Sequence, residues 1–375
     1  MGETGIEGYF ALVNGKKLRF GYTTGTCAAG AAKAACLLLL TGKAPERVAI
    51  ATPKGIDLSL EVLEPSLEDG AAVCAIRKFS GDDPDVTDGV LVYARVRALP
   101  PPEIIITGGV GVGRVTKPGL KQPVGEAAIN PGPREMIRRA AEEALAECGE
   151  DVGLAIEISV PEGVEIARKT FNPRLGIEGG ISILGTSGIV EPMSEEALLE
   201  SIRLEIRQKR ALGQEELILV PGNYGADFLR KEYGIPDERM VKCSNFLGRA
   251  LDMAAEAGFP RVFLAGNLGK MVKLAGGIMN THSREADARG ELMAGCALRA
   301  GADGDTARAI LDCVTTDEML RVIDAAGLLN KTAAVLGERI GFYLRARVKE
   351  QFALRALVFS DIYGLLCDIR PEKDI

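Results

Sequence analysis

The stretch ELILVPGNYG, residues Glu216–Gly225, decides the fold predicted for the second half of the chain. An apolar run of strand length, Glu216–Val220, enters a turn with proline and two glycines, and a helix is expected directly after it. The same alternation continues along the chain, which indicates βαβ crossovers and a parallel sheet. The other strands expected in this half are Ile181–Leu184, Arg239–Lys242 and Arg261–Ala265, and the helices are Glu195–Leu212, Ala226–Tyr233, Phe246–Ala257, Lys270–Leu274 and Arg284–Arg299, with a mostly helical tail at Asp303–Leu366.

The first half has a different rhythm, in which strands cluster with few helices between them. The change falls near Asn172–Pro173. We therefore predict two domains: residues 1–172, a mixed-sheet α+β domain, and residues 173–375, a Rossmann-like βαβ domain with a helical C-terminal tail. The elements expected in the first domain are helices at Thr26–Leu40 and Arg134–Cys148 and strands at Arg47–Thr52, Asp57–Leu63, Ala71–Lys78, Val90–Arg97, Glu103–Thr107 and Ala155–Val160.

Charge and composition exclude several classes of protein. The 375 residues carry 45 Lys and Arg against 52 Asp and Glu, a net charge of −7, which argues against a nucleic-acid binder. The apolar run Ala34–Leu40 is too short to cross a bilayer, which takes about 20 residues. The acidic start, Met1–Glu7, has no basic segment typical of a signal peptide. We expect a cytoplasmic protein without a membrane partner.

Cysteine and histidine usage argues against a metal site. The eight cysteines form no C-x-x-C pair, and scattered single cysteines fit a reducing cytoplasm. His282 is the only histidine, so a site with several histidine ligands is impossible, and any histidine base must be this residue. We therefore expect no metal bound by the protein itself.

Three glycine-rich loops follow strands predicted in the second half. Open parallel sheets bind ligands at the carboxyl ends of their strands, where glycine lets backbone amides approach closely. One such loop is commonly only a tight turn, but three on one sheet favour a cofactor site. The candidate cofactor-binding residues are Gly185, Thr186, Ser187 and Gly188 in the first loop, Gly222, Asn223 and Gly225 in the second, and Gly266, Asn267 and Gly269 in the third.

A basic loop and a threonine-rich helix start are candidate anion sites in the first half. The G-x-G-x-G run at Gly108–Gly113 is followed by a turn, so it is a weak dinucleotide motif. The cations near it suit bound carboxylates or phosphates, although a solvated loop explains them too. The threonines cap the predicted helix or, with its amides, bind an anion. These candidate substrate-binding residues are Arg114, Lys117, Lys121 and Arg134 and Thr23, Thr24 and Thr26.

His282 is the candidate catalytic residue. It precedes the helix expected at Arg284–Arg299, whose dipole would favour neutral imidazole, although a histidine bonded to the helix entrance is equally compatible. Lys270 and Lys273 are three residues apart on one predicted helical turn, so they reach one cleft or face water. Lys270 is included among the substrate-binding candidates.

Four long motifs occur in order along the chain: GYTTGTCAA at Gly21–Ala29, GVGRVTKPGLKQPVGEAAI at Gly111–Ile129 with Asn130-Pro131, GTSGIVEPMS at Gly185–Ser194 and GKMVKLAGGIMNTHS at Gly269–Ser283. Together they resemble the CbiD family, the cobalt-precorrin-5B C(1)-methyltransferases of anaerobic cobalamin synthesis. The resemblance runs from about Leu18 to the C-terminal region. Many members of that family have a histidine where this chain has Asn267, and this departure argues against a universal catalytic role for the position.

The resemblance implies S-adenosylmethionine (SAM) as methyl donor and a cobalt-bound tetrapyrrole as acceptor, with cobalt entering only as part of that substrate. A corrinoid with many carboxylates suits spaced cations. Two alternatives stay open: a nicotinamide-dependent oxidoreductase, which lacks its fingerprint here, and a non-catalytic tetrapyrrole carrier. A homo-oligomer or transient contact with neighbouring pathway enzymes also stays open.

Overall fold

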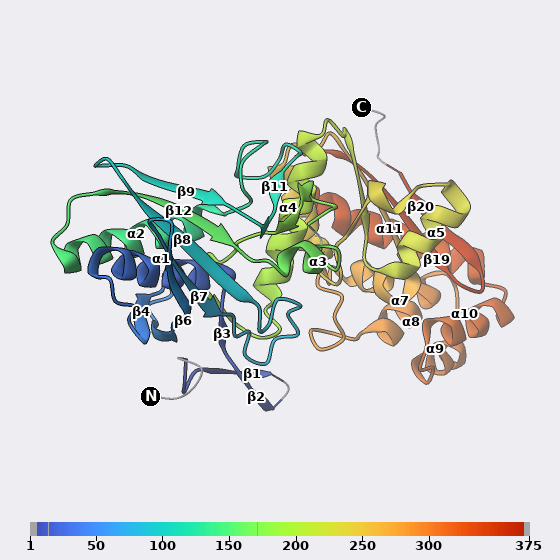
Figure 1. The fold of residues 1–375 in the computed structure, drawn as a ribbon. Coiled ribbons are helices and arrows are strands. Elements are labelled where there is room, and N and C mark those ends of the chain that lie inside the picture. The colour runs from blue at the N-terminus through green and yellow to red at the C-terminus, as the bar shows by residue number, and fades with distance from the viewer. Residues whose placement is uncertain (1–5, 14, 171, 371–375) are drawn as a thin grey trace. The chain divides into compact units, whose positions relative to one another are not determined.

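The computed structural model describes residues 6–13, 15–170 and 172–370. Residues 1–5, on which the prediction about a signal peptide depends, and the ends of both predicted domains lie outside that range. The chain forms two compact units, Met1–Glu195 and Glu196–Ile375. Each combines helices and strands, so the chain is a mixed α/β protein (Figure 1).

The N-terminal unit is organised around a five-stranded sheet with the order β6-β7-β8-β12-β9, in which only β12 and β9 pair in parallel. Alternate residues of β8, among them Val92, Ala94 and Val96, join the core that α1 and α2 complete. Period-two burial of this kind is typical of a strand, and the strand predicted at Val90–Arg97 is confirmed. The elements are β6 (Leu63–Glu68), β7 (Ala71–Arg77), β8 (Leu91–Leu99), β9 (Ile104–Gly108), β12 (Gly153–Ser159), α1 (Thr24–Thr41), α2 (Pro131–Cys148) and α3 (Gly163–Ala167).

Helix α1 is the central helix of this unit. Its small residues, Cys27 to Ala35, are buried, because alanine and glycine let α2 and the sheet approach closely on several sides. By length and composition α1 could cross a membrane, which the shorter run Ala34–Leu40 did not suggest. Most of it is buried in the core of the unit, as is usual for the central helix of a globular protein.

Short strands bring distant parts of the N-terminal half together. β15 pairs with β3, β14 with β10, and β13 with β11. These pairings hold residues 173–190 in the N-terminal unit, so the boundary falls at Glu195 and not near Asn172–Pro173. The short elements are β1 (Phe10–Val13), β2 (Lys16–Arg19), β3 (Gly21–Tyr22), β4 (Arg47–Ala51), β5 (Asp57–Glu61), β10 (Gly111–Val112), β11 (Arg114–Val115), β13 (Ile177–Glu178), β14 (Gly180–Ile181) and β15 (Ile189–Val190).

The C-terminal unit contains an open sheet with the order β17-β16-β18-β19-β20, parallel except for β20. Leu217 and Leu219 of β16 face one core with α4, α6 and α8, whereas Ile218 and Val220 face α5 on the other side. Helices therefore cover both faces, and the predicted crossovers are confirmed. The elements are α4 (Glu195–Ala211), β16 (Glu216–Val220), α5 (Asn223–Tyr233), β17 (Met240–Lys242), α6 (Leu247–Glu256), β18 (Arg261–Asn267), α7 (Leu268–Met271) and α8 (Arg289–Arg299), with 3-10 turns at Asp237–Arg239 and Val272–Gly276.

The C-terminal tail is mostly helical, as predicted, but the two strands at its end were not predicted. Three helices are followed by two strands, β19 and β20, which complete the sheet. Leu354, Ala356 and Val358 alternate into the core, but the run ALRALV also has helical spacing, so sequence alone did not separate the two. The tail elements are α9 (Gly304–Leu311), α10 (Thr316–Ala325), α11 (Leu329–Val348), β19 (Ala353–Ser360) and β20 (Gly364–Ile369).

The glycines of the run at Gly108–Gly113 serve backbone packing. Gly111 has a φ of 74°, and a Cβ there would overlap the carbonyl oxygen of Val160. A Cβ on Gly113 would lie 2.8 Å from the carbonyl oxygen of Gly180. The spacing that resembled a nucleotide motif is therefore required where β10 meets β14.

We expect Gly111→Ala to lower the free energy of unfolding by about 3 kcal/mol, because the added methyl group meets rigid backbone and not a side chain that can move. Differential scanning calorimetry of the full chain measures this loss. Gly42→Ala is the matched control: Gly42 has a φ of 71° with nothing within 4 Å, so only the left-handed backbone penalty of about 1–2 kcal/mol applies. Equal losses for the two variants would contradict the packing argument.

Candidate functional site

The C-terminal sheet has a reversal point between β16 and β18. From β16 the chain passes through α5 to β17 on one side, then through α6 to β18 on the other side of β16. In open parallel sheets a crevice for ligands forms where the connections diverge, outside the carboxyl ends of the strands. That position is bordered here by the loops that follow Val220 and Gly266, two of the three glycine loops predicted to bind a cofactor.

Two glycines in these loops border open space. A Cβ on Gly222 would meet only the Lys270 Nζ, at 3.9 Å, and one on Gly269 would meet nothing closer than 3.4 Å. Gly225 and Gly266 differ, because their Cβ atoms would lie 2.6 Å from the Ala265 carbonyl oxygen and 2.7 Å from the Met271 Sδ, respectively. Only Gly222 and Gly269 therefore offer backbone to a ligand.

The two asparagines predicted in these loops organise the chain locally. The Asn267 side chain caps α7 by accepting a hydrogen bond from the Gly269 N–H at 2.9 Å. Asn223 Oδ1 accepts a hydrogen bond from Lys242 Nζ at 2.8 Å. Asn267 is therefore engaged as the N-cap of α7.

Lys270 reaches across the crevice. It lies on α7, and its Nζ donates a hydrogen bond of 2.7 Å to the Pro221 carbonyl oxygen at the end of β16. Burial lowers the pKa of the Lys270 ammonium, and the charge on Lys273 adds to this effect while Cys243 opposes it. A half-buried ammonium is stabilised by a nearby anionic group, because the opposite charge offsets the cost of desolvation.

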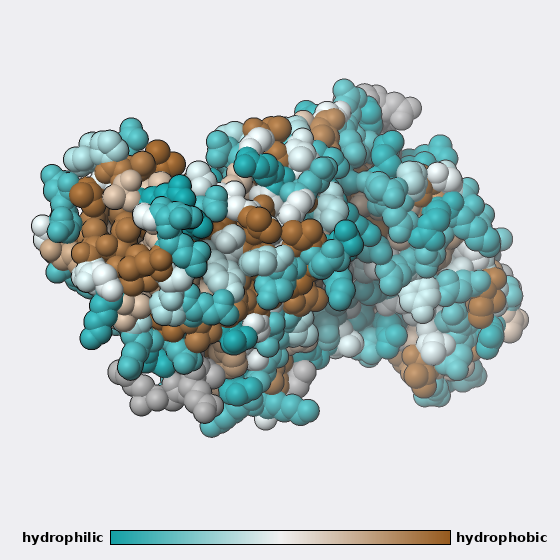
Figure 2. Space-filling view, in the orientation of Figure 1, coloured by the Kyte–Doolittle hydropathy of each residue, from teal (hydrophilic) through white to brown (hydrophobic). Residues whose placement is uncertain are grey.

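A polar cavity of about 290 Å³ adjoins the crevice. Lys273, only 3% exposed, donates to the Thr281 carbonyl oxygen at 3.1 Å, and burial lowers its pKa although Asp287 opposes that shift. On the face drawn in Figure 2 the C-terminal unit is mostly hydrophilic, and larger hydrophobic areas lie over the N-terminal unit. The cavity is lined by Asn245, Gly269, Lys270, Lys273, Thr281, His282, Ser283 and Arg289.

His282 lines this cavity but does not sit at a helix start. Helix α8 begins at Arg289, so the predicted influence of its dipole on His282 does not apply. Instead, His282 Nδ1 accepts a hydrogen bond of 3.1 Å from the Arg284 N–H. A neutral imidazole with Nδ1 engaged in this way carries its proton on Nε2, so it presents a donor.

The threonines of the N-terminal motif are bonded to the first glycine loop. Thr26 Oγ1 donates to the Gly188 carbonyl oxygen at 2.6 Å, and Thr24 Oγ1 accepts from the Leu184 N–H at 2.9 Å. Thr23 caps α1, and the Gly25 N–H donates to the Leu184 carbonyl oxygen at 2.8 Å. The hydroxyl groups and amides at the start of α1 are therefore hydrogen-bonded to the segment Leu184–Gly188 and to one another. That segment occupies the place where an anion was predicted to bind.

The loop Gly185–Gly188 therefore does not join the other two at the C-terminal sheet. It belongs to the N-terminal unit, because β14 and β15 on either side pair with β10 and β3. Ser187 Oγ donates to the Ile189 carbonyl oxygen at 3.0 Å, and Thr186 lines a second cavity of about 340 Å³ beside α2. The expectation that all three loops end strands of one sheet is wrong.

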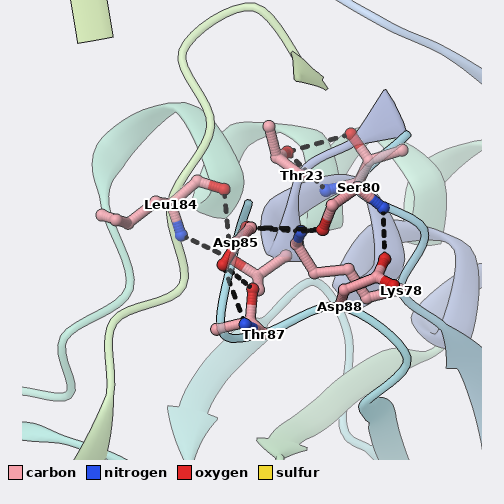
Figure 3. A network of polar contacts seen from close by, with 9 residues as sticks. Thr23, Lys78, Ser80, Asp85, Thr87, Asp88 and Leu184 are labelled. Carbon is pink, nitrogen blue, oxygen red and sulfur yellow. Dashed lines mark hydrogen bonds and ion pairs between the residues drawn. The ribbon is translucent and has the colours of Figure 1, made fainter. Parts of the chain in front are cut away.

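An ion pair between buried Lys78 and half-buried Asp85, near the start of α1, was not predicted. Lys78 Nζ donates to Ser80 Oγ at 2.5 Å and to Asp85 Oδ2 at 2.7 Å, and Thr87 bonds Asp85 as well (Figure 3). Burial opposes ionisation of Asp85, but Lys78 and these hydrogen bonds hold its pKa below the usual value. All members are satisfied within the cluster, which fits a structural role.

The four cations predicted near the basic loop differ in how far their side chains are bonded within the protein. Arg134 donates to the carbonyl oxygens of Ile129 and Ile106, at 3.2 and 3.0 Å, so it fixes the start of α2. Arg114 and Lys121 are exposed, and Lys117 is half-buried. Of the predicted substrate cations in this loop, Arg114, Lys117 and Lys121 remain accessible to a ligand, although Arg114 also bonds the Gly125 carbonyl oxygen.

Sequence reasoning missed Asn245, Thr281 and Arg289 as members of the polar cavity. Thr281 lies in a quoted motif, but Asn245 and Arg289 carry no local signal because each is brought there by the fold. In the residues that the structure describes, no three His, Cys, Asp or Glu side chains lie together as a metal site.

Comparisons with known proteins agree with the motifs. The CbiD family model matches residues 11–192, and a CbiD C-terminal domain model matches residues 280–368. A "cobalt-precorrin-5B C(1)-methyltransferase" from Ruminiclostridium cellulolyticum is 46% identical over 96% of this chain and 93% of that protein. One of the same name from Thermoanaerobacter sp. is 50% identical over 95% of this chain and 97% of that protein.

A solved structure is also similar: the cobalamin biosynthesis protein (cbiD) from Archaeoglobus fulgidus, with 30% identity, a TM-score of 0.41, and coverage of 76% of this chain and 88% of that one. The family assignment depends on the sequence matches alone. The chain belongs to the CbiD family.

We expect Lys270→Met to raise the free energy of unfolding at pH 7 by about 0.5–2 kcal/mol, because it removes a charge whose burial opposes folding. The folded-state pKa of Lys270 lies below its unfolded value of 10.5, so the wild type gains stability as pH rises between the two values. The advantage of the variant should shrink over that interval in thermal melts. A large loss of stability at pH 7 would instead make Lys270 a structural residue.

Proposed function

We propose that this chain is a SAM-dependent C-methyltransferase that methylates C-1 of cobalt-precorrin-5B to give cobalt-precorrin-6A in anaerobic cobalamin biosynthesis. The observation that carries the proposal is the near-full-length similarity to relatives that bear this enzyme name. The crevice between β16 and β18 supports it, because a methyl donor needs a site that holds it in a fixed orientation.

The methyl donor is placed in the C-terminal unit, which we interpret as Rossmann-like from its strand order. Gly222 and Gly269 offer open backbone at the crevice, and Tyr224, 67% exposed in the first turn of α5, offers an aromatic face for the adenine. Gly225 and Gly266 support these loops from behind. Lys270, predicted as a substrate ligand, borders the same crevice and faces an anionic group of a ligand.

SAM supplies a methyl group on a sulfonium, which a ring carbon attacks while the carbon–sulfur bond breaks and its electron pair passes to sulfur. Such a displacement needs alignment more than a strong base. His282 fits this requirement as a group that orients a ligand through its Nε2–H, because its Nδ1 is engaged by Arg284. We therefore propose that His282 acts as a donor and not as the base.

The N-terminal unit is proposed to contribute acceptor binding through Arg114, Lys117 and Lys121. Thr23, Thr24 and Thr26 are proposed to act indirectly, by holding the loop at Gly185–Gly188. Arg134 similarly holds the start of α2. The acceptor brings its own cobalt. All eight cysteines are free thiols, which supports a cytoplasmic enzyme.

The decisive experiment incubates the purified chain with cobalt-precorrin-5B and SAM that carries a ¹³C-labelled methyl group. The expected product is a corrinoid heavier by one labelled methyl group, together with one equivalent of S-adenosylhomocysteine. Binding of the corrinoid without label would favour the carrier. Calorimetric binding of NADH or NADPH without binding of SAM would favour the oxidoreductase.

We expect Arg114→Ala and Lys117→Ala each to raise the KM for the corrinoid about tenfold, because each removes one charge-assisted contact to a carboxylate. The KM for SAM should change less than twofold, since both residues lie in the basic loop of the N-terminal unit. Steady-state kinetics with each substrate varied in turn measures the split. Lys169→Ala, an exposed lysine outside this loop, is the matched control, and equal losses for the two substrates would remove the loop from the acceptor site.

A further inference from the structure

The polar cavity of the C-terminal unit gathers three cations, and the Asp287 carboxylate balances only part of their charge. Lys270, Lys273 and Arg289 line it, and none of the described residues lining it is a carboxylate. The nearest acid, Asp287, is bonded to Arg289 and lies 4.0 Å from Lys273 Nζ. Two lysines and an excess of charge therefore share one cavity of about 290 Å³.

Both lysines keep donors for a ligand. An ammonium has three N–H donors. Among the residues that the structure describes, Lys270 donates to the Pro221 carbonyl oxygen and Lys273 to the Thr281 carbonyl oxygen, while Asp287 lies beyond hydrogen-bond distance of Lys273. Burial lowers the pKa of both ammonium groups, which is the cost expected where an anion completes a desolvated site.

Two neutral groups of the cavity present donors as well. Thr281 Oγ1 donates to Asn245 Oδ1 at 3.4 Å, which leaves the Asn245 amide group as a donor. His282 presents Nε2–H because its Nδ1 accepts from the Arg284 N–H. Ammonium, amide and imidazole donors in one cavity are complementary to a group that only accepts hydrogen bonds, as an ionised carboxylate does.

We propose that this cavity is a carboxylate-binding pocket in which Lys270 and Lys273 both bond the ligand. The pocket itself follows from the geometry. The identity of the bound carboxylate rests on the proposed function. It is either the amino-acid carboxylate of the methyl donor or a side-chain carboxylate of the corrinoid. Lys273 is the sharper probe of the two lysines, because only 3% of it is exposed.

Calorimetry with S-adenosylhomocysteine and its decarboxylated analogue, S-adenosyl-3-thiopropylamine, tests the first source. We expect Lys273→Met to weaken binding of S-adenosylhomocysteine about tenfold to hundredfold and that of the analogue less than twofold. Lys273→Arg should recover part of the loss because it keeps the charge. Lys331→Met, an exposed lysine on α11, is the matched control.

The KM for cobalt-precorrin-5B tests the second source. If Lys273→Met leaves both adenosyl ligands unaffected but raises this KM about tenfold or more, the pocket holds a corrinoid carboxylate. Unchanged binding of all three ligands, or equal weakening of both adenosyl ligands, would overturn the proposal. Each measurement is repeated with Lys270→Met, which keeps the proposal testable if Lys273→Met does not fold. Methyl transfer by the wild type is scored separately, so failure of the pocket leaves the proposed function intact.

Discussion

Parallel pairing between β16 and β18 is the constraint on which the candidate site depends. The register sets Leu217 opposite Val262 and Leu219 opposite Leu264, so both strands end at the same edge of the sheet. The connection after β16 leads to α5 on one face of the sheet, and the one after β18 leads to α7 on the other face, which is the arrangement that forms a ligand crevice at this edge. Gly222, Lys270 and the cavity around Lys273 all owe their proximity to this one pairing.

The positions of Lys273, which is buried, and Lys270, which is half-buried, lower the stability of the fold. Desolvation of an ammonium opposes folding, and the same low local dielectric strengthens its attraction to an anion. Lys273 is held by the Thr281 carbonyl oxygen and Lys270 by the Pro221 carbonyl oxygen, so the chain itself fixes the position of both ammonium groups. Preorganised charge of this kind favours binding and orientation over stability.

The motifs that carry the family resemblance fall into two physical classes. In the N-terminal unit, Thr24 and Thr26 bond the segment Leu184–Gly188, and Gly111 permits close approach of β10 to β14; these residues hold backbone segments together. In the C-terminal unit, the motif from Gly269 to Ser283 lines an open cavity. A motif thus shows that its residue types are needed at those positions. Only the contacts around them in the structure show whether they are needed for packing or for binding a ligand.

By itself the sequence determined most regular elements, because their burial periods are local properties: the strand Glu216–Val220 and the helix Phe246–Ala257 were predicted nearly to the residue. It also identified the family and singled out Lys270 and His282, which line the same polar cavity. Only the tertiary structure decided that Gly185–Gly188 belongs to the N-terminal unit and that Asn245 and Arg289 share a cavity with Lys273. The physical reason is that strand pairing and cavity formation join residues far apart in the chain, and no local pattern specifies those partners.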